Sequence, residues 1–316
     1  MKEPNFFSGG AFDRAGLRRK DEGYIARLRQ DPTTRMIPVW RDQHLILIKQ
    51  EPEPVYLAPH EVPPLAAEDE QVALLGLVGE QAVFAFDISH IDAPLDRPEL
   101  SGRGDFVDIR DVGSLLSRAD AQLMVLARAL FYWHRRHAYC GVCGAPTLSG
   151  EAGHVRVCTN PPCGTTHFPR TDPAVIMLVT DGDRCLLGRR PGRQNFMYST
   201  LAGFVEPGES LEEAVAREVM EETGIVATNI RYAHSQPWPF PANLMLGFYA
   251  DAGTTDIRLN PDELADARWF TRDDVAELMA VRDRNEAERL GGALHLPRPV
   301  SIARRLISEW LEGRAP

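Results

Sequence analysis

The stretch that decides the fold of the second half of the chain runs from Gly203 to Ile225 and reads GFVEPGESLEEAVAREVMEETGI. Within it, the segment from Ser210 to Thr223 predicts a helix. Ser210 and Glu213 have the spacing of a capping box, in which each side chain accepts a hydrogen bond from the other residue's backbone N–H. Gly224 follows at the position where helices often end in a left-handed residue. Both ends of the predicted helix are therefore marked in the sequence.

One side of this predicted helix is apolar and another side is acidic. The apolar positions recur every four residues and predict a stripe that docks on a sheet; they are Leu211, Val215 and Val219. The acidic positions are Glu218, Glu221 and Glu222. Their i, i+3, i+4 spacing places the Cβ atoms about 5–6 Å apart. Such like charges disfavour a helix unless a divalent cation neutralises them, and ligands that are all oxygen favour Mg²⁺ or Mn²⁺. The alternative interpretation is a solvated acidic surface.

The residues around the glutamates favour a built site over a solvated surface. We expect Gly203 to permit a close backbone turn before the helix. We expect Arg217 to hold a neighbouring carboxylate, that of Glu209, through two parallel hydrogen bonds. An acidic surface without a ligand requires neither feature.

The composition indicates a folded protein of about two domains. Of the 316 residues, 44% are hydrophobic and 25% are charged, so the chain can bury a core without disulfide bonds and is neither fibrous nor wholly disordered. A net charge of -10 argues against non-specific binding to DNA. The apolar runs are shorter than the ~20 residues of a membrane helix, and Met1 to Gly10 lacks the apolar stretch of a secretory signal. We therefore expect a cytoplasmic protein that does not span a membrane.

Hydrophobic patterns predict a strand-rich first half and a mixed second half. The strand-like runs of the first half are Ile37 to Trp40, Leu45 to Lys49, Val72 to Val78 and Ala82 to Ile88. An amphipathic helix is predicted from about Arg118 to His137. After it, Asp181-Gly182 predicts a hairpin turn between two strands. The later elements are a strand over Leu244 to Ala250 and helices near Asp273 to Met279 and Pro299 to Leu311.

Four clustered cysteines have the spacing of a metal site. They are Cys140, Cys143, Cys158 and Cys163. Each pair lies on a short turn rich in Gly or Pro, which suits tetrahedral zinc, and four thiolates would leave no open position for water. We therefore predict one structural Zn²⁺ per chain. The alternatives are a disulfide pair, unbound thiols, or the replacement of one sulfur by His154 or His167. Cys185 lies between apolar residues of a predicted strand and is interpreted as a core thiol.

The glutamate-bearing segment resembles the signature of the Nudix hydrolases. The matching positions read Gly203-x5-Glu209-x7-Arg217-Glu218-Val219-x-Glu221-Glu222-x-Gly224-Ile225. A second motif, Ser235-Gln-Pro-Trp-Pro-Phe-Pro241 followed by Leu244-Met245, resembles the segment that marks the NADH pyrophosphatase group of that family. The resemblance implies an α+β architecture with a Nudix α-β-α sandwich over residues 171–316. It also implies a strand-rich N-terminal domain that ends in a helix, over residues 1–133, and a small zinc ribbon over residues 134–170.

The resemblance also implies roles for individual residues. Glu218, Glu221 and Glu222 would bind the catalytic metals, Ala202 would offer its backbone carbonyl, and Glu263 would be a further metal-coordinating or catalytic residue. Phe204 and Phe168 resemble the aromatic pair that holds the base, with Phe168 where the family has Tyr. The pocket-lining positions would be Gln236, Pro237, Trp238, Pro239, Phe240, Pro241, Ala242, Asn243 and Ala303, with Asn243 where Ser is usual. Arg110 resembles an N-terminal arginine that reaches the substrate, although a surface arginine is an alternative.

The function implied by these resemblances is hydrolysis of a dinucleotide. The three prolines of the second motif make a stiff extended strip with aromatic faces on which bases can stack; the alternative is a rigid loop that closes the core. The resemblance implies metal-dependent cleavage of NADH or NAD⁺ to NMN(H) and AMP, the same cleavage at the NAD cap of RNA, and a homodimer. The alternative substrates are ADP-ribose, a dinucleoside polyphosphate or CoA. An alternative of another class is a zinc-ribbon nucleic-acid adaptor without catalysis.

Overall fold

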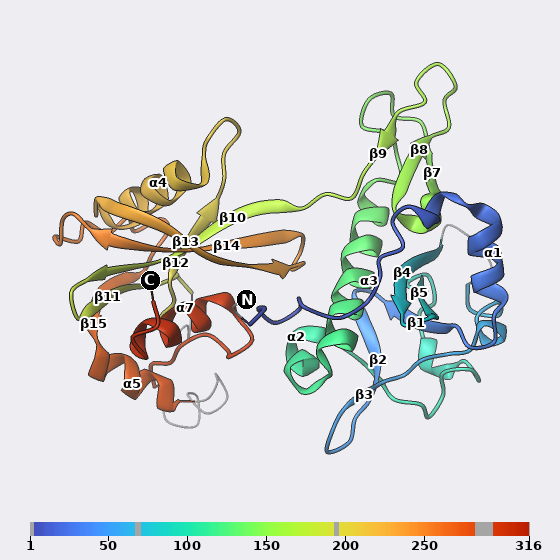
Figure 1. Ribbon diagram of the computed structural model, residues 1–316, viewed down its shortest axis with the longest axis horizontal. Helices are drawn as coiled ribbons and strands as arrows, with labels where there is room; N and C mark the ends of the chain where they lie inside the picture. The colour runs from blue at the N-terminus through green and yellow to red at the C-terminus, as the bar shows by residue number, and fades with distance from the viewer. Residues whose placement is uncertain (1–2, 67–70, 193–195, 282–292, 316) are drawn as a thin grey trace. The chain divides into compact units, whose positions relative to one another are not determined.

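The computed structural model describes residues 3–66, 71–192, 196–281 and 293–315. It divides the chain into two compact units (Figure 1). The first unit contains residues 1–6, 172–238 and 243–316, and the second contains residues 7–171 and 239–242. The three-domain division at residues 133 and 170 stays a prediction, because the zinc-ribbon segment belongs to the same compact unit as the N-terminal sheet.

The second unit is built on a mixed sheet. Its strands are β1 (Arg35–Trp40), β2 (Gln43–Leu47), β3 (Glu53–Pro54), β4 (Val72–Val78), β5 (Gln81–Asp87) and β6 (Asp105–Val107), in the order β3-β2-β1-β5-β4 with β6 beside β2. The pair β1 and β5 is parallel, whereas β4 and β5 form an antiparallel hairpin. Nearly every residue of β4 and β5 is buried, as expected for strands covered on both faces. The predicted strand-rich N-terminal region is confirmed.

Helices and a small second sheet complete this unit. The helices are α1 (Glu22–Gln30), α2 (Ile109–Val112) and α3 (Arg118–Arg136), and the 3-10 segments are η1 (Arg18–Lys20), η2 (Pro59–Glu61), η4 (Pro94–Asp96), η5 (Gly113–Leu115) and η6 (Glu151–Gly153). The predicted amphipathic helix is α3, which contacts β1 and β4. The small sheet has the antiparallel strands β7 (Thr147–Gly150), β8 (Val155–Cys158) and β9 (Thr166–His167).

The first unit contains a six-stranded mixed sheet. Its strands are β10 (Asp172–Asp181), β11 (Arg184–Arg189), β12 (Leu201–Phe204), β13 (Ala227–Trp238), β14 (Asn243–Ala252) and β15 (Asp266–Thr271), in the order β13-β14-β10-β11-β15 with β12 beside β10. The predicted hairpin joins β10 and β11, with Gly182 at φ 58° in its turn. The central strand β10 pairs in parallel with β14 and antiparallel with β11 and β12.

This sheet is covered on both faces, because alternate side chains of β10 enter two different cores. Ala174, Ile176 and Leu178 join one core with residues of α5 (Arg272–Ala280) and α7 (Ile302–Leu311). Val175, Met177 and Val179 join the other core, with residues of α4 (Leu211–Thr223). Figure 1 shows α4 on one side of the sheet and α5 and α7 on the other. The predicted α-β-α sandwich is confirmed, and Cys185 is fully buried in β11 as the core thiol.

Helix α4 has both predicted ends. Its N-cap, Ser210, forms the capping box with Glu213, and Gly224 follows the helix at φ 69°. Val215 and Val219 are fully buried in the core beneath the helix, and Leu211 packs against the edge of that core. The apolar stripe therefore fixes the rotation of α4 on the sheet, and this rotation decides where its glutamates lie. Among the described residues, no helix has the length and apolar composition needed to cross a membrane.

Candidate active site

The acidic side of α4 meets the loop before β15 at one point. One carboxylate oxygen each from Glu218, Glu222 and Glu263 lies within 4.8 Å of the others, and we call these three residues the acidic cluster. Glu263 reaches this point because its loop is tied to the end of α4, where the Asn260 N–H donates to the Glu222 backbone carbonyl at 3.1 Å. Two carboxylates from one helix are thus joined by a third from a distant loop.

Glu222 is the most buried member of the acidic cluster, with 4% of its surface exposed. Burial raises its pKa to about 8; the negative charges of Glu218 and Glu263 add to this shift, and the positive charge of Arg190 opposes it. Its Oε2 atom has no hydrogen-bond partner among the described residues. A buried carboxylate in this setting is costly unless a cation accompanies it, and hard oxygen donors suit Mg²⁺ or Mn²⁺. The residues present therefore fit the predicted divalent metal.

Glu221 is placed differently from the other two glutamates of the helix. Its side chain is 49% exposed, and its carboxylate accepts a hydrogen bond from Arg217 Nη1 at 3.0 Å. It is not a member of the acidic cluster. The sequence spacing groups Glu221 with Glu222, but the rotation of α4 directs only Glu218 and Glu222 toward Glu263. A metal-binding role for Glu221 stays a prediction.

Arg217 organises the carboxylates around the cluster. Its Nε and Nη2 donate to the two carboxylate oxygens of Glu209 at 2.7 and 3.0 Å, which confirms the predicted pair of parallel hydrogen bonds. Its Nη1 also donates to Glu218 Oε1 at 2.8 Å, and Nη2 donates to the Phe204 carbonyl at 2.9 Å. The hydrogen bonds from Arg217 lower the pKa of Glu209 to about 2. One guanidinium therefore links the helix, the loop before it and strand β12.

Gly203 is required by close packing rather than by a turn. It lies within β12, opposite Val175, and a Cβ atom at this position would lie 1.8 Å from the Glu218 carboxylate carbon. The expected turn at this glycine is therefore wrong, because the strand continues to Phe204 and the turn comes later. The hydrogen atom of Gly203 leaves the space that the Glu218 carboxylate occupies.

The Ala202 carbonyl lies next to this position on the same strand. It accepts a hydrogen bond from Arg190 Nη2 at 3.3 Å, and Arg190 also acts electrostatically on Glu222. The positively charged Arg190 side chain is thus already attracted to groups that were predicted to hold the metal. The sequence reasoning missed Arg190, which directly follows β11 (Arg184–Arg189).

The cysteine cluster has the geometry of a four-thiolate site. One Sγ from each of Cys140, Cys143, Cys158 and Cys163 lies within 4.8 Å of the others. The closest pairs are separated by 3.4 and 3.8 Å, which is longer than the ~2.05 Å of a disulfide bond. His167 Nε2 lies 3.2 Å from Cys140 Sγ, as a neighbour of a ligand would. His154 instead donates to the Leu74 carbonyl at 2.6 Å. Four thiolates at these distances suit tetrahedral zinc.

The proline-rich motif begins as an edge strand and ends as a turn. Gln236, Pro237 and Trp238 are the last residues of β13 and pair with the start of β14 at Asn243. Because β13 lies at the sheet edge, its one proline, Pro237, removes no hydrogen bond to a further strand. The four turn residues are Pro239, Phe240, Pro241 and Ala242, and the Phe240–Pro241 peptide bond is cis.

Gln236 is a structural residue in this arrangement. It is fully buried, its Nε2 donates to the Val300 carbonyl at 2.7 Å, and its Oε1 accepts from the Ile302 N–H at 2.8 Å. The amide therefore ties the edge strand to the start of α7. A substrate contact by Gln236 stays a prediction.

Arg110 and Phe240 are brought together in the second unit. The Arg110 guanidinium lies 5.2 Å from the Phe240 ring centroid and is held by Asp108, to which Nη2 donates at 2.6 Å. Arg128 lies over the same ring at 4.8 Å and donates to the Pro239 carbonyl. Sequence reasoning missed Arg128, although a charged residue on an apolar helix side was an available signal.

The remaining predicted residues differ in exposure. Phe168 and Phe204 have 68% and 57% of their surface exposed, so each residue is accessible to a base that stacks on its ring. Ala303 is buried in the core beneath α7. Phe168 belongs to the second unit and Phe204 to the first, and their pairing around a base stays a prediction.

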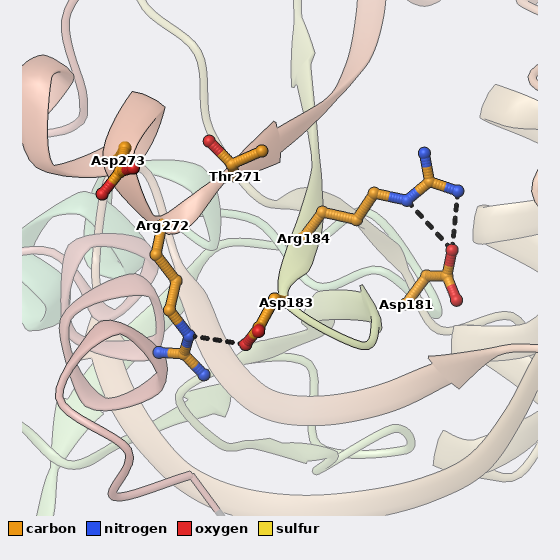
Figure 2. Close-up of a pocket in the computed structure, with 6 residues that line it drawn as sticks. All are labelled: Asp181, Asp183, Arg184, Thr271, Arg272 and Asp273. Atoms are coloured by element: carbon orange, nitrogen blue, oxygen red, sulfur yellow. Dashed lines mark hydrogen bonds and ion pairs between the residues drawn. The ribbon is translucent and has the colours of Figure 1, made fainter.

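A separate pocket of the first unit is lined mainly by two arginine–aspartate pairs. Figure 2 shows Arg184 directed at Asp181 and Arg272 directed at Asp183. Thr271 and Asp273 complete the lining. None of the residues that were predicted to bind metal or substrate lines this pocket, so the acidic cluster remains the candidate active site.

The comparisons with known proteins agree with this geometry. Residues 170–290 match the NUDIX domain, residues 33–133 the NADH pyrophosphatase-like rudimentary NUDIX domain, and residues 135–168 the NADH pyrophosphatase zinc ribbon domain. Over 220 residues, the chain is 44% identical to a Mycobacterium bovis protein named NAD-capped RNA hydrolase NudC, which covers 69% of this chain and 68% of the relative. The chain belongs to the Nudix hydrolases of the NADH pyrophosphatase group.

Other relatives of this Nudix hydrolase include a human protein. The protein named NAD(P)H pyrophosphatase NUDT13, mitochondrial, is 38% identical over 255 residues, which cover 77% of this chain and 72% of the relative. Among solved structures, a NUDIX hydrolase from Nitrosomonas europaea aligns with a TM-score of 0.37 and 22% identity, covering 50% of this chain and 96% of that chain.

Proposed function

We propose that this Nudix hydrolase cleaves the pyrophosphate bond of NADH or NAD⁺ to give NMN(H) and AMP, and removes the NAD cap from RNA by the same cleavage. The three matched domains and the relatives named for NAD-capped RNA and NAD(P)H support this substrate class. The observation that carries the proposal is the acidic cluster, in which the buried Glu222, whose Oε2 has no hydrogen-bond partner among the described residues, lies beside two other carboxylates. An acidic surface without a ligand would expose these groups to water instead.

Each residue of the site has its own role in the proposed reaction. Glu218 and Glu222 of α4 would hold the divalent metal together with Glu263 of the loop before β15, and the Ala202 carbonyl would add a neutral oxygen ligand. Bound there, Mg²⁺ or Mn²⁺ would supply positive charge that neutralises the pyrophosphate and the departing nucleotide. A glutamate of the motif accepts the proton of the attacking water. The water oxygen forms a new bond to one phosphorus as the bond from that phosphorus to the bridging oxygen breaks.

Arg217 acts on this chemistry through the carboxylates. It does not belong to the acidic cluster, but it donates to Glu218 and Glu209 at 2.8 and 2.7 Å. The hydrogen bond to Glu209 holds the guanidinium in place, and the hydrogen bond to Glu218 then orients the Glu218 carboxylate. We therefore assign Arg217 as a positioning residue, and we assign the exposed Phe204 ring as a stacking surface for the base.

The finer features of the proposal concern zinc, assembly and location. We propose one structural Zn²⁺ per chain at the cysteine cluster, supported by the matched ribbon over residues 135–168. The homodimer, the cytoplasmic location and the three-domain division stay predictions. Elemental analysis and light scattering of the purified chain test zinc content and assembly directly.

The experiment is an assay of NADH, NAD⁺ and NAD-capped RNA with Mg²⁺ or Mn²⁺, in which AMP or the freed RNA 5′ end is measured. We expect metal-dependent AMP release that Glu222→Gln abolishes. Glu212→Gln is the matched control, because it removes an exposed charge from the same helix. Near-normal turnover by Glu222→Gln would refute the role of the cluster. A higher specificity constant for ADP-ribose, a dinucleoside polyphosphate or CoA would show that this compound, rather than NAD(H), is the preferred substrate. Folded protein that cleaves none of these compounds would favour the alternative of a nucleic-acid adaptor without catalysis.

A further inference from the structure

The second unit contains a cavity that the proposed activity does not use. Its volume is about 590 Å³, and its lining comes from η1, α1, β4, β5 and the segment that contains η6. The η6 turn contacts β4 and the segment from η1 to α1. Small-molecule sites commonly have volumes of about 300–1,000 Å³. The cavity is therefore large enough for a ligand the size of a nucleotide.

The wall formed by η6 is held firmly against the sheet. Glu151, Ala152 and Gly153 have φ angles of 48°, 53° and 92°, a left-handed run that non-glycine residues seldom adopt. A Cβ atom at Gly153 would lie 2.5 Å from the Cβ of Ala73 in β4. The turn is thus packed directly on the strand, so this wall is formed before any ligand binds.

The cavity carries an excess of positive charge, although the whole chain is acidic. Arg19, Lys20 and Arg29 line it, against Glu22 and Glu151. This local balance is opposite in sign to the net charge of -10 for the chain. An anionic ligand would therefore be attracted to this cavity despite the net negative charge of the chain.

Arg19 is the residue of the cavity that most requires an anion. Burial lowers its pKa, Glu151 raises it, and the neighbouring Arg14 lowers it further. Its Nε has no hydrogen-bond partner among the described residues. Glu151 also pairs with Lys20, whose Nζ lies 3.4 Å from its carboxylate, so one carboxylate serves two cations. A phosphate group would supply the missing acceptors.

Part of the cavity lining is apolar. From the sheet, Val72, Leu74 and Phe84 line it but are already buried, so the apolar surface open to a ligand comes from the partly buried Ile25 of α1 and Ala152 of η6. Inorganic phosphate would leave this surface uncovered, whereas a nucleoside would cover it with its flat base. The chemistry of the lining therefore selects a ligand with an anionic end and a flat apolar end.

We propose that this cavity binds a nucleoside phosphate, with its phosphate at Arg19 and Lys20 and its base against Ile25 and Ala152. The proposal is independent of the catalytic function, because none of these residues belongs to the candidate active site.

The test is calorimetric titration of the full chain with AMP, adenosine and inorganic phosphate, without added Mg²⁺ or Mn²⁺. We expect AMP to bind more tightly than adenosine or phosphate. Arg19→Gln should weaken this binding about 10-fold or more, since it removes a charge-assisted contact. Arg27→Gln is the matched control, because Arg27 is an exposed arginine of α1 that does not line the cavity.

Lys20→Gln keeps the test decisive if Arg19→Gln does not fold. The Lys20 side chain is 70% exposed, so its loss should weaken AMP binding without unfolding the protein. Cleavage of NADH should be unchanged in Lys20→Gln and Arg27→Gln. Equal AMP affinity in the parent chain and Lys20→Gln would overturn the proposal. Phosphate binding as tight as AMP binding would also overturn it, because the site would then select an anion without a nucleoside.

Discussion

Replacing Glu222 by Gln should abolish catalysis and, in the absence of a bound metal, should also raise the free energy of unfolding. Glu222 is 4% exposed, and the pKa of its carboxyl rises from 4.5 to about 8, first through burial and then through Glu218. Between these pH values the unfolded carboxyl has lost its proton while the folded carboxyl retains it. The free energy of unfolding therefore falls as pH rises through this interval. A Gln side chain carries no charge at any pH and avoids this loss.

The size of the effect follows from the two pKa values. At about 1.4 kcal/mol per pH unit, the interval between 4.5 and about 8 corresponds to about 5 kcal/mol at most. Local relaxation around the charged carboxylate reduces this, so we expect about 2–4 kcal/mol at pH 8.5. At pH 4.5 the difference between the parent chain and Glu222→Gln should almost vanish. The pH dependence thus separates charge burial from any change in packing.

The assay is urea unfolding between pH 4.5 and 8.5, in buffer without Mg²⁺ or Mn²⁺ and without a chelator that would remove zinc. Because the chain has two compact units, the relevant transition is the one that added Mg²⁺ shifts in the parent chain. Glu222→Gln should raise the midpoint of this transition at pH 8.5 and should lose its response to Mg²⁺. Glu212→Gln, on the exposed side of the same helix, should do neither.

Two results would refute the reasoning. If Glu222→Gln is less stable than the parent chain at pH 8.5, the buried carboxylate is not a source of strain. If the difference in stability is the same at pH 4.5 and 8.5, the effect does not come from the charge. In either case, the inference that the acidic cluster requires a cation loses its physical basis.

Three further predictions concern other parts of the molecule. Gly203→Ala should lower kcat for NADH about 100-fold, because the new methyl group displaces a carboxylate of the acidic cluster. The control is Gly141→Ala, where an added Cβ meets no atom within 4 Å. An unchanged kcat in Gly203→Ala would contradict the close packing. Cys158→Ser should lose bound zinc and lower the melting temperature, whereas Cys185→Ala should keep its zinc in elemental analysis; zinc retained by both would count against the ribbon site. Phe168→Ala should raise KM for NADH about 10-fold through lost stacking, and Phe168→Tyr should not; equal KM for all three chains would remove Phe168 from the site.

Much of the fold followed from local patterns. Helix α4 was predictable with both ends, because a capping box and a left-handed glycine act within one turn of the helix. The hairpin at Gly182 and the core position of Cys185 were predictable for the same reason, since turn chemistry and strand alternation are local properties. The grouping of the zinc ribbon with the N-terminal sheet was not predictable, because it depends on contacts between segments such as η6 and β4.

The candidate site was predictable in its residue types but not in its arrangement. The spacing of Glu218 and Glu222 placed both on one side of a helix, and Arg217 was correctly paired with Glu209. The same spacing could not show that Glu221 turns toward Arg217 instead. The sequence also predicted that Gly203 lies in a turn, whereas this glycine lies in β12 and allows the Glu218 carboxylate of α4 to approach the strand closely.

By itself, the sequence determined that a capped helix carries an apolar stripe and an acidic side, and that four thiols can gather on two turns, because these properties depend on neighbours a few residues apart. Only the tertiary structure decided which carboxylates share a site. The burial of Val215 and Val219 sets the rotation of α4, and the bond from Asn260 to Glu222 brings Glu263 to the same point. These are packing contacts between distant segments, and no local pattern contains them.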